Sequence, residues 1–366
     1  MNATMWIWEN KSWPDFHYDL TKITPILEET VRAVAPLALL SNELDSTKQL
    51  ELESHVLLDE ALSTAKIEGE ILDRESVRSS IVNRLGISKA TRLSKSSQAF
   101  VDVLLESIRQ SSDTLTEQDL FKWHHMLFIE KPLLYTMIIG DYRNETMQVV
   151  SGRFGKQTVH FQAPCQNRQS VAAEMQQFLN WLENGSCPSG YIKAAIAKFW
   201  FVTIHPFDDG NGRFSRLIAE RCLAETENTN VRLYSLSTEI ERNKIEYYAL
   251  LEKCQSGGMD ITEWIIWFLT QVKFAAISSM KRLDKIRLST LFWDQHKGTK
   301  INDRQRKLII RLLETNDFAE GVSRRKYKNL VKTSDPTAAR DLKDLLDKSV
   351  LDVVGAGRST RYILKT

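Results

Sequence analysis

The chain has 366 residues, enough for two or three domains that each bury a core of their own. Its hydrophobic content of 42% and charged content of 26% are ordinary for a soluble globular protein. The net charge of +2 hides an asymmetry: residues 301–366 carry 15 Lys and Arg against 9 Asp and Glu, a net of +6, and the other 300 residues carry 34 against 38, a net of −4. Clustered positive charge favours nucleic acid, but this excess alone decides little.

The cysteines show no Cys-x-x-Cys pair and no histidine partner at zinc spacing. This usage predicts reduced, mostly buried thiols at Cys165, Cys187, Cys222 and Cys254. The amino end has no basic segment followed by an apolar run, so no secretory signal is expected. The most apolar stretch, residues 264–269, is too short to span a bilayer. These features predict a cytoplasmic protein with no membrane partner.

The amino-terminal part of the chain begins with an aromatic segment of about 32 residues. The alternation of Trp6 and Trp8 predicts a short strand or an extended arm packed on the body. Residues 27–84 contain few helix breakers, and apolar residues recur there at helical spacing. Gly69 is a natural stop for one of these helices.

The middle of the chain predicts helices and a single clear hairpin. β-branched residues on both sides of two glycines place the hairpin over residues 147–162. Periodicity and capping residues predict helices at 99–108, after a cap at Thr116, and at 170–183, 191–204, 217–224, 239–251 and 261–277. His124 and His125 point about 100° apart on a helix, so they cannot chelate one metal and are expected in the core or on the surface.

A different pattern follows a charged connecting helix at residues 280–300. Periodicity and caps predict three helices and then a hairpin with Gly-Ala-Gly at its tip, over residues 304–314, 323–331, 334–347 and 350–364.

The segment 205–216, His-Pro-Phe-Asp-Asp-Gly-Asn-Gly-Arg-Phe-Ser-Arg, lies between two predicted helices. Gly210 and Gly212 allow successive N–H groups to point into one concavity at a helix start, whose positive end favours an anion. Arg213 and Arg216 share one face of that helix and can both reach a phosphate chain. The alternative is a helix corner with solvated arginines. The glycines and the arginines all suit anion binding, however, so we favour a phosphate-binding loop with the histidine beside it as a base.

This segment is similar, position by position, to the signature His-x-Phe-x-(Asp/Glu)-Gly-Asn-Gly-Arg-x-x-Arg of the Fic-type protein AMP-transferases. The resemblance implies an all-α fold with a hairpin flap, and transfer of AMP from ATP to a Ser, Thr or Tyr hydroxyl of a target protein or of the enzyme itself. His205 would take the hydroxyl proton, and Asp209 would hold Mg2+ on the phosphates. The anion-hole donors and the phosphate-neutralising cations would be Gly210, Asn211, Gly212, Arg213 and Arg216.

A second motif lies nearer the amino end. The run from Thr64 through Glu68 to Gly69 fits the Fic inhibitory pattern (Ser/Thr)-x-x-x-Glu-(Gly/Asn). The resemblance implies that Glu68 pairs with Arg216 and places a carboxylate where the γ-phosphate of ATP should lie. ATP would then bind with its α-phosphorus badly placed for in-line attack. A solvated Glu at a helix end is the alternative.

Further nucleotide contacts follow from the same resemblance. The flap, which would hold the target segment by strand addition, maps its positions nearest the nucleotide onto Ser151, Gly152, Arg153 and Phe154. This hairpin is longer than the family usually has, so the register of those positions stays open. A Tyr-Tyr pair, with an amide eight residues on, maps Tyr247 and Gln255 near the adenine, although the tyrosines could instead line a helix core.

The resemblance covers about residues 1–280 and implies three parts: residues 1–85 with the Trp-rich segment and inhibitory motif, 86–280 as the Fic catalytic domain, and 281–366 similar to a winged helix-turn-helix. In that last fold the third helix would enter a DNA groove, with Arg358 and Arg361 near phosphates. The groove-facing side would include the acids Asp341, Asp344 and Asp347, which disfavours tight DNA binding. Homodimerisation or target docking is therefore favoured over DNA as the role of residues 301–366.

Two other functions stay open. Within the family, Glu68 could orient a water that removes AMP from a modified target. In a different class, the chain could be a DNA-binding regulator whose Fic body senses nucleotide. The residues do not fix the nucleobase.

Overall fold

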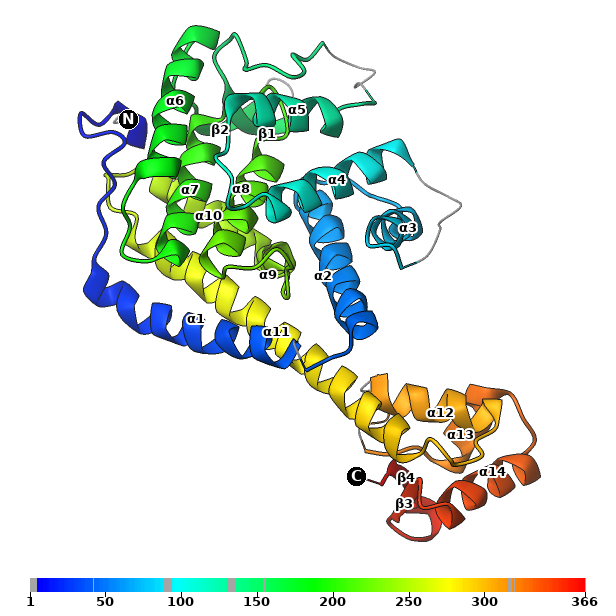
Figure 1. The fold of residues 1–366 in the computed structure, drawn as a ribbon. Coiled ribbons are helices and arrows are strands. Elements are labelled where there is room, and N and C mark those ends of the chain that lie inside the picture. Colours follow the sequence, from blue (N-terminus) through cyan, green and yellow to red (C-terminus); the bar gives the residue numbers. More distant parts are fainter. Residues whose placement is uncertain are drawn as a thin grey trace. The chain divides into compact units, whose positions relative to one another are not determined.

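The computed structural model describes residues 5–41, 43–87, 94–130, 136–153, 156–314, 318 and 320–365. It divides into two compact units, Met1–Ser279 and Met280–Thr366 (Figure 1). Helices dominate both units, and the strands described form two separate two-stranded hairpins, which confirms the prediction of a mainly helical fold. Among the described helices, none is both long enough and apolar enough to cross a membrane.

The first unit begins with a short 3-10 turn and continues through ten helices and one hairpin in the described residues. In chain order these are η1 (Ile7–Glu9), α1 (Leu20–Ser41), α2 (Ser46–Ile67), α3 (Arg74–Arg84), α4 (Lys95–Arg109), α5 (Glu117–Leu127), β1 (Gln148–Arg153), β2 (Lys156–Gln162), α6 (Arg168–Asn184), α7 (Gly190–Ile204), α8 (Asn211–Thr226), α9 (Leu236–Arg242) and α10 (Lys244–Gln255). The next helix, α11 (Thr262–Gln295), contains the boundary between the units.

The core of the first unit is built on α7 and α8, which pack against each other. Nearly every residue of both helices is buried. α7 is apolar or small on nearly all sides, as expected for a helix buried all round, whereas α8 also buries charged residues such as Arg216 and Glu220. α11 covers α7, and its Trp264 donates a hydrogen bond to the Ala195 carbonyl at 2.8 Å. The loop joining α7 to α8 is therefore held between two immobilised helices, and this loop carries the glycine-rich motif.

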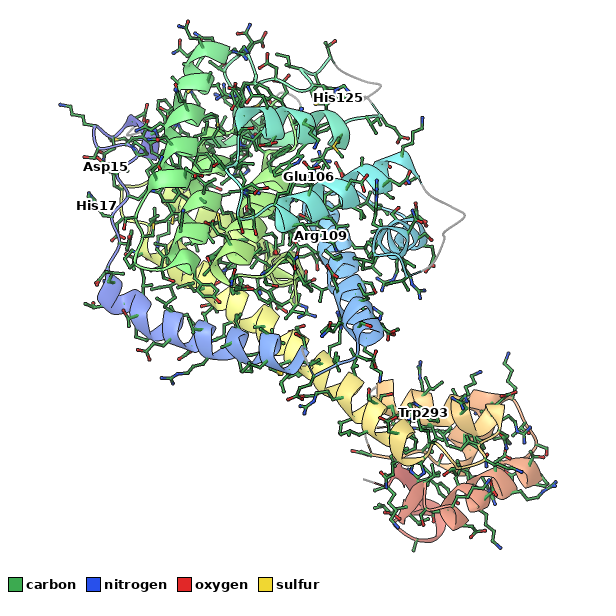
Figure 2. The ribbon with its side chains drawn as sticks, viewed as in Figure 1. Asp15, His17, Glu106, Arg109, His125 and Trp293 are labelled. Carbon is green, nitrogen blue, oxygen red and sulfur yellow. The ribbon has the colours of Figure 1, made fainter. Side chains whose placement is uncertain are left out.

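The helix boundaries confirm most of the periodicity-based predictions. α2 ends at Ile67, and Gly69 follows with a φ of +80°, the left-handed conformation expected of a helix stop. α5 starts at a capping box in which Thr116 and Asp119 satisfy each other's backbone N–H groups. His124 is fully buried, whereas His125, labelled in Figure 2, is exposed.

Two expectations about elements were wrong. The helix expected over 239–251 is broken into α9 and α10 at Asn243, whose amide donates to the Glu239 carbonyl (3.0 Å) and to Gln271 (2.9 Å) and so competes with the helical pattern. The helices expected at 261–277 and 280–300 form the single helix α11, because neither glycine nor proline interrupts residues 262–295.

The aromatic amino-terminal segment packs on the body as an arm rather than as a strand. The Glu9 carboxylate accepts the Trp6 N–H at 2.7 Å and closes a 3-10 turn. Trp8 donates its indole N–H to the Gln162 carbonyl at 2.6 Å, and Trp13 donates its own to Glu174 at 3.0 Å. The packing of this segment on the body is confirmed, but Ile7–Glu9 form a 3-10 turn, so neither the strand nor the extended conformation was right there.

The second unit has its own apolar core, to which Leu308, Tyr327 and Leu342 contribute. Its elements after α11 are α12 (Asp303–Glu314), α13 (Arg324–Val331), α14 (Asp335–Asp347), β3 (Leu351–Val354), η2 (Gly357–Ser359) and β4 (Arg361–Leu364). Three helices followed by a hairpin are the parts that a winged helix requires, and that identification stays a prediction.

One expectation about the surface of this unit was wrong. Asp341 does not face outward: it is buried, and its carboxylate accepts two hydrogen bonds from Arg304 (2.8 and 3.0 Å) and one from the Tyr327 hydroxyl (2.9 Å). A buried carboxylate must find such partners, and the helical period alone did not reveal them.

Candidate active site

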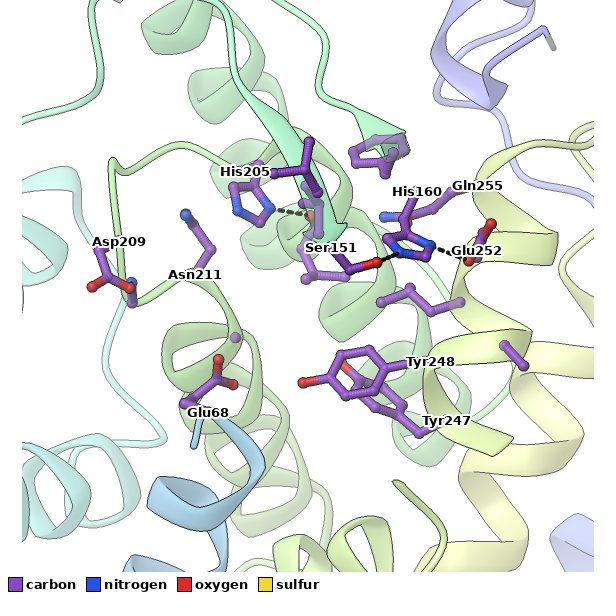
Figure 3. A pocket seen from close by; sticks show the side chains of 18 of the residues that line it. Glu68, Ser151, His160, His205, Asp209, Asn211, Tyr247, Tyr248, Glu252 and Gln255 are labelled. Atoms are coloured by element: carbon purple, nitrogen blue, oxygen red, sulfur yellow. Dashed lines mark hydrogen bonds and ion pairs between the residues drawn. The ribbon is translucent and has the colours of Figure 1, made fainter. Parts of the chain in front are cut away.

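A cavity of about 630 Å³ opens between the α7–α8 loop, the hairpin, the end of α2 and α10 (Figure 3). Residues predicted from four separate stretches of sequence meet in its wall. They are Glu68, Ser151, His205, Asp209, Gly210, Asn211, Gly212, Tyr247 and Gln255.

The motif loop is held in shape by side chains that turn inward. The Asn211 amide accepts from the Phe207 N–H at 2.9 Å and donates to the Phe207 carbonyl at 2.7 Å. His124 stacks on Phe207, accepts from the Gly140 N–H at 3.0 Å and bonds the Asp209 carbonyl at 3.2 Å. The Asn211 side chain thus fixes the loop, and only its backbone N–H is left to serve an anion.

His205 ends α7 in the left-handed conformation, with a φ of +53°. Its Nδ1 lies 3.1 Å from the Val202 carbonyl, which can only accept, so Nδ1 carries the proton and Nε2 keeps its lone pair. Burial lowers the pKa of His205 to about 4, so the ring is neutral at pH 7. A neutral imidazole with a free acceptor nitrogen at a cavity wall can take a proton from a hydroxyl.

The carboxylate of Glu68 meets the second motif arginine. Arg216 donates from Nη2 to Glu68 Oε1 at 2.6 Å and to the Thr64 carbonyl at 3.2 Å, and its Nε donates to the Thr64 hydroxyl. Burial opposes ionisation of Glu68, but the charges of Arg216 and Arg213 outweigh it and hold the pKa of this carboxyl below its usual value. The three positions that matched the inhibitory pattern are therefore adjacent: Gly69 turns the chain, Thr64 fixes Arg216, and Glu68 pairs with it.

Gly212 explains how closely this carboxylate approaches the start of α8. A Cβ on Gly212 would lie 2.2 Å from Glu68 Oε1, so only a glycine leaves room for the acid. An anionic group therefore already lies at the helix N-terminus, where the dipole favours negative charge. Gly210 caps the same helix with a φ of +86°. In the described residues, Arg216 Nη1 and Arg213 Nε are buried with no hydrogen-bond partner, as expected of donors that await anionic oxygens.

A second acid at the end of α2 was missed by the motif. Glu70 Oε1 lies 3.0 Å from Arg213 Nη1, and the Arg213 side chain is only 7% exposed, while Glu70 is 43% exposed. Burial raises the pKa of Glu70 despite the Arg213 charge. The inhibitory pattern ends at Gly69, so the pairing could be inferred only once the fold brought residue 70 to α8.

Lys198 was also missed. It is fully buried in α7, donates to the Tyr247 hydroxyl at 2.9 Å and lies over the Tyr247 and Trp264 rings. Burial, and then the charge of Arg216, lower the pKa of Lys198 well below its usual value. Lys198 lies seven residues before His205, about two helical turns away on the same helix face. This spacing could have predicted Lys198 as a residue of the candidate site.

The α10 residues mapped to the adenine lie in the cavity wall but also serve the core. Tyr247 stacks on Trp267 with ring centroids 5.5 Å apart, so its place in the helix core is confirmed, and its contact with adenine stays a prediction. Tyr248 donates to the Ile67 carbonyl at 3.3 Å and thereby ties α10 to the end of α2. Gln255 donates to the Thr203 hydroxyl at 3.1 Å.

The hairpin is confirmed, and of its four mapped positions Ser151 lies in the cavity wall. Gly152 follows in β1 with a φ of +103° and does not line the cavity. Only the backbone of Arg153 is described, and Phe154 lies outside the described residues.

Asp209 is the candidate metal ligand. Its Oδ1 accepts from the Gly210 N–H at 2.6 Å and lies 3.8 Å from Arg213 Nη2. Over the described ranges, no three His, Cys, Asp or Glu side chains gather as a ready-made metal cluster. Mg2+ typically needs only one or two protein carboxylates when phosphate oxygens complete its shell, so a lone carboxylate beside an anion cradle fits it.

Two family models match separate parts of the chain. Residues 6–87 match a domain of unknown function (DUF4172), and residues 114–223 match the Fic/DOC family. A probable protein adenylyltransferase of Aquifex aeolicus is 32% identical over 85 residues, which are 23% of this chain and 24% of that protein. The chain thus aligns with about a quarter of the length of this curated relative.

Solved structures share the fold at low sequence identity. A Fic family protein from Desulfovibrio desulfuricans superimposes with a TM-score of 0.57 and 20% identity over 95% of this chain and 97% of that one. A Fic domain containing signaling protein from Bacteroides thetaiotaomicron gives 0.51 and 17% over 72% and 96%, and Fic-1 from C. elegans gives 0.51 and 19% over 74% and 76%. The match to the family model, over the segment that carries the motif, identifies residues 114–223 as a Fic domain, and the solved structures show that the fold is shared.

Proposed function

We propose that this protein transfers AMP from ATP to Ser, Thr or Tyr hydroxyls of other proteins, and that Glu68 inhibits the transfer in the resting protein. The observation that carries the proposal is the neutral His205, whose acceptor nitrogen shares a cavity with an anion-favouring helix start. The match to the Fic family and the likeness to a probable protein adenylyltransferase support it.

The chain's own residues supply three of the needs of such a transfer. His205 Nε2 takes the hydroxyl proton as the oxygen attacks the α-phosphorus, and the pyrophosphate leaves. The N–H groups at the start of α8 receive the phosphate oxygens, and Arg213 and Arg216 neutralise the charge of the outer phosphates. Tyr247 and Gln255 border the space for the base.

Asp209 is the residue that would hold Mg2+, which when bound would offset the charge of the phosphates. The flap has a separate role in the proposal. Its strands β1 and β2 form a two-stranded sheet, so a target segment can add to an edge as a further strand and bring its hydroxyl to the cavity.

Inhibition follows from the two ion pairs at the end of α2. Glu68 and Glu70 engage the two arginines that the phosphates of ATP need. ATP must either displace the acids, which weakens its binding, or bind with its outer phosphates elsewhere, which takes the α-phosphorus out of line with the attacking oxygen.

The test measures label transferred from α-labelled ATP, with Mg2+ present, to a mixture of added soluble proteins rather than to the enzyme itself. Glu68→Gly is expected to raise the initial rate by at least about tenfold, the effect of removing roughly 1.4 kcal/mol of competition for Arg216. Adding His205→Ala to that variant is expected to lower the rate by about a hundredfold or more, the usual contribution of a general base.

His125→Ala is the matched control, because His125 is exposed on α5 and lies outside the cavity wall. Equal rates for wild type and Glu68→Gly would contradict the inhibition, and acceptors that stay unlabelled with Glu68→Gly would contradict the transfer. Free AMP released by the wild-type protein from pre-labelled acceptors would instead assign the hydrolytic removal of AMP.

A further inference from the structure

Three side chains stand in line on one wall of the cavity: Ser151, His160 and Glu252 (Figure 3). Ser151 Oγ lies 2.5 Å from His160 Nε2, and His160 Nδ1 lies 2.9 Å from Glu252 Oε2. A carboxylate accepts, so Nδ1 carries the ring proton and Nε2 accepts from the serine hydroxyl. This is the arrangement by which a histidine, oriented by an acid, activates a serine oxygen.

The local fold produces this alignment through an irregularity in the hairpin. Val149 pairs with Phe161 and Val150 pairs with Val159, so His160 is an extra residue without an opposite partner. A bulge of this kind re-aims a side chain, and here it brings the ring to the diagonal position beside Ser151. Glu252 comes from α10, far away in the sequence.

A purely structural account explains only part of this geometry. A pair between His160 and Glu252 would fasten the hairpin to α10 without any hydroxyl. Such a contact does not explain why a serine hydroxyl bonds the other nitrogen of His160. Ser151 lies on the side of the hairpin that borders the cavity. His205 and Gly212, which come from the motif segment, line the same cavity.

We infer that Ser151 is itself an acceptor, and that the protein adenylylates its own flap there with His160 as the base. The inference rests on the proposed function, since ATP bound in the cavity is the AMP donor. It adds a modification site and a second proton acceptor to that function.

The step balances as a displacement at phosphorus. Ser151 Oγ forms a bond to the α-phosphorus, and the hydroxyl proton passes to His160 Nε2. The bond from the α-phosphorus to the oxygen bridging to the β-phosphate breaks, and pyrophosphate leaves with the electron pair. The Glu252 carboxylate stabilises the imidazolium that results. The product is a phosphodiester between Ser151 and AMP, which places a bulky anion on the flap where a target would dock.

The experiment uses the full-length Glu68→Gly protein incubated alone with ATP and Mg2+, then digested and mapped by tandem mass spectrometry. AMP is expected on the peptide containing Ser151, and Ser151→Ala should remove the adduct from that position. His160→Gln keeps a side chain that can donate to Glu252, so it preserves the fastening but removes the base. It is expected to slow labelling of Ser151 on the order of a hundredfold.

Thr158→Ala provides the matched control. Thr158 pairs directly with Ser151 across the hairpin and also carries a hydroxyl, but it does not line the cavity. Its removal should leave the rate at Ser151 unchanged, and Thr158 itself should stay unlabelled.

The outcomes separate this inference from the proposed function. AMP on added proteins, with none on Ser151, overturns the inference and leaves the function standing. Labelling of Ser151 at the same rate in His160→Gln also overturns it, because the proton then goes elsewhere. Absence of AMP from both Ser151 and the added proteins overturns the function and this inference together.

Discussion

His124 and His205 are both neutral at pH 7, but their ring nitrogens have different surroundings. Both have a pKa lowered to about 4 by burial. In His124 both ring nitrogens are engaged, so its neutral form is a structural part that holds the motif loop. In His205 only Nδ1 bonds the backbone, which leaves Nε2 to act as the base of the proposed transfer.

The buried His124 makes stability depend on pH. An unfolded histidine takes a proton near pH 6.5, whereas the folded ring resists protonation until about pH 4. Between these values the unfolded chain binds more protons, so the folded state loses stability as the pH falls through this window, by about 3 kcal/mol for this residue. Urea unfolding at pH 7 and at pH 4.5 should show the loss. In His124→Gln the free energy of unfolding should fall less over this pH range, by about the 3 kcal/mol assigned to His124. An equal fall in both proteins would refute the low pKa of His124.

Site residues could be predicted from the sequence where the chemistry is local. Gly210, Arg213 and Arg216 lie close together in the sequence. Their position at a helix start is enough to predict that they bind an anion. Glu70 and Lys198 could not be predicted in this way, because their partners are set by how distant helices pack.

At the scale of elements, the end of α2 brings two acids to the arginines at the start of α8. Glu68 is 28% exposed and pairs with the more deeply buried arginine. Glu70 lies just past the helix end and is the more accessible of the two. The two acids reach α8 because Gly69 turns the chain between them.

Glu70 should therefore contribute less than Glu68 to the proposed inhibition. In the Glu68→Gly background, Glu70→Gln is expected to lower the KM for ATP by about twofold to fivefold, the range for a partly exposed ion pair. Initial rates over a range of ATP concentrations measure this effect. Glu51→Gln, an exposed position elsewhere on α2, is the control. A KM that moves equally in both variants would show that Arg213 does not contact the nucleotide.

Element types could be predicted more reliably than element limits. α7 and α8 could be predicted because the apolar residues on both sides of the motif and the glycines between them all indicate two helices joined by a turn. The break at Asn243 depends on a hydrogen bond to Gln271 in another helix, and no local pattern encodes it. The bulge at His160 is likewise a property of the paired strands rather than of either strand alone.

On the scale of the whole molecule, two units with separate cores should respond separately to mutation. Asp341 is central to the second unit, where it joins Arg304 of α12 and Tyr327 of α13 to α14. Its equivalent in the first unit is the Arg232–Glu220 pair at 2.6 Å, both members of which are buried.

Asp341→Asn is expected to destabilise the second unit by about 2 kcal/mol, because it weakens hydrogen bonds to a charged group. Hydrogen exchange of α13 and α14 should accelerate, while exchange in α7 and α8 stays as in the wild type. Faster exchange in both units would mean that they unfold as one. The winged-helix identification, DNA binding and dimerisation of residues 281–366 stay predictions that such stability data leave untouched.

The aromatic arm gives the start of the chain a hold on the flap. Trp6 packs edge-on against Phe161 with ring centroids 5.4 Å apart, and Trp8 bonds the carbonyl of Gln162, 154 residues further on. Phe161 in turn borders the cavity. A protease that cut the chain shortly before Trp13 would therefore remove one of the supports of β2, and the cavity wall that Phe161 forms would change as a result.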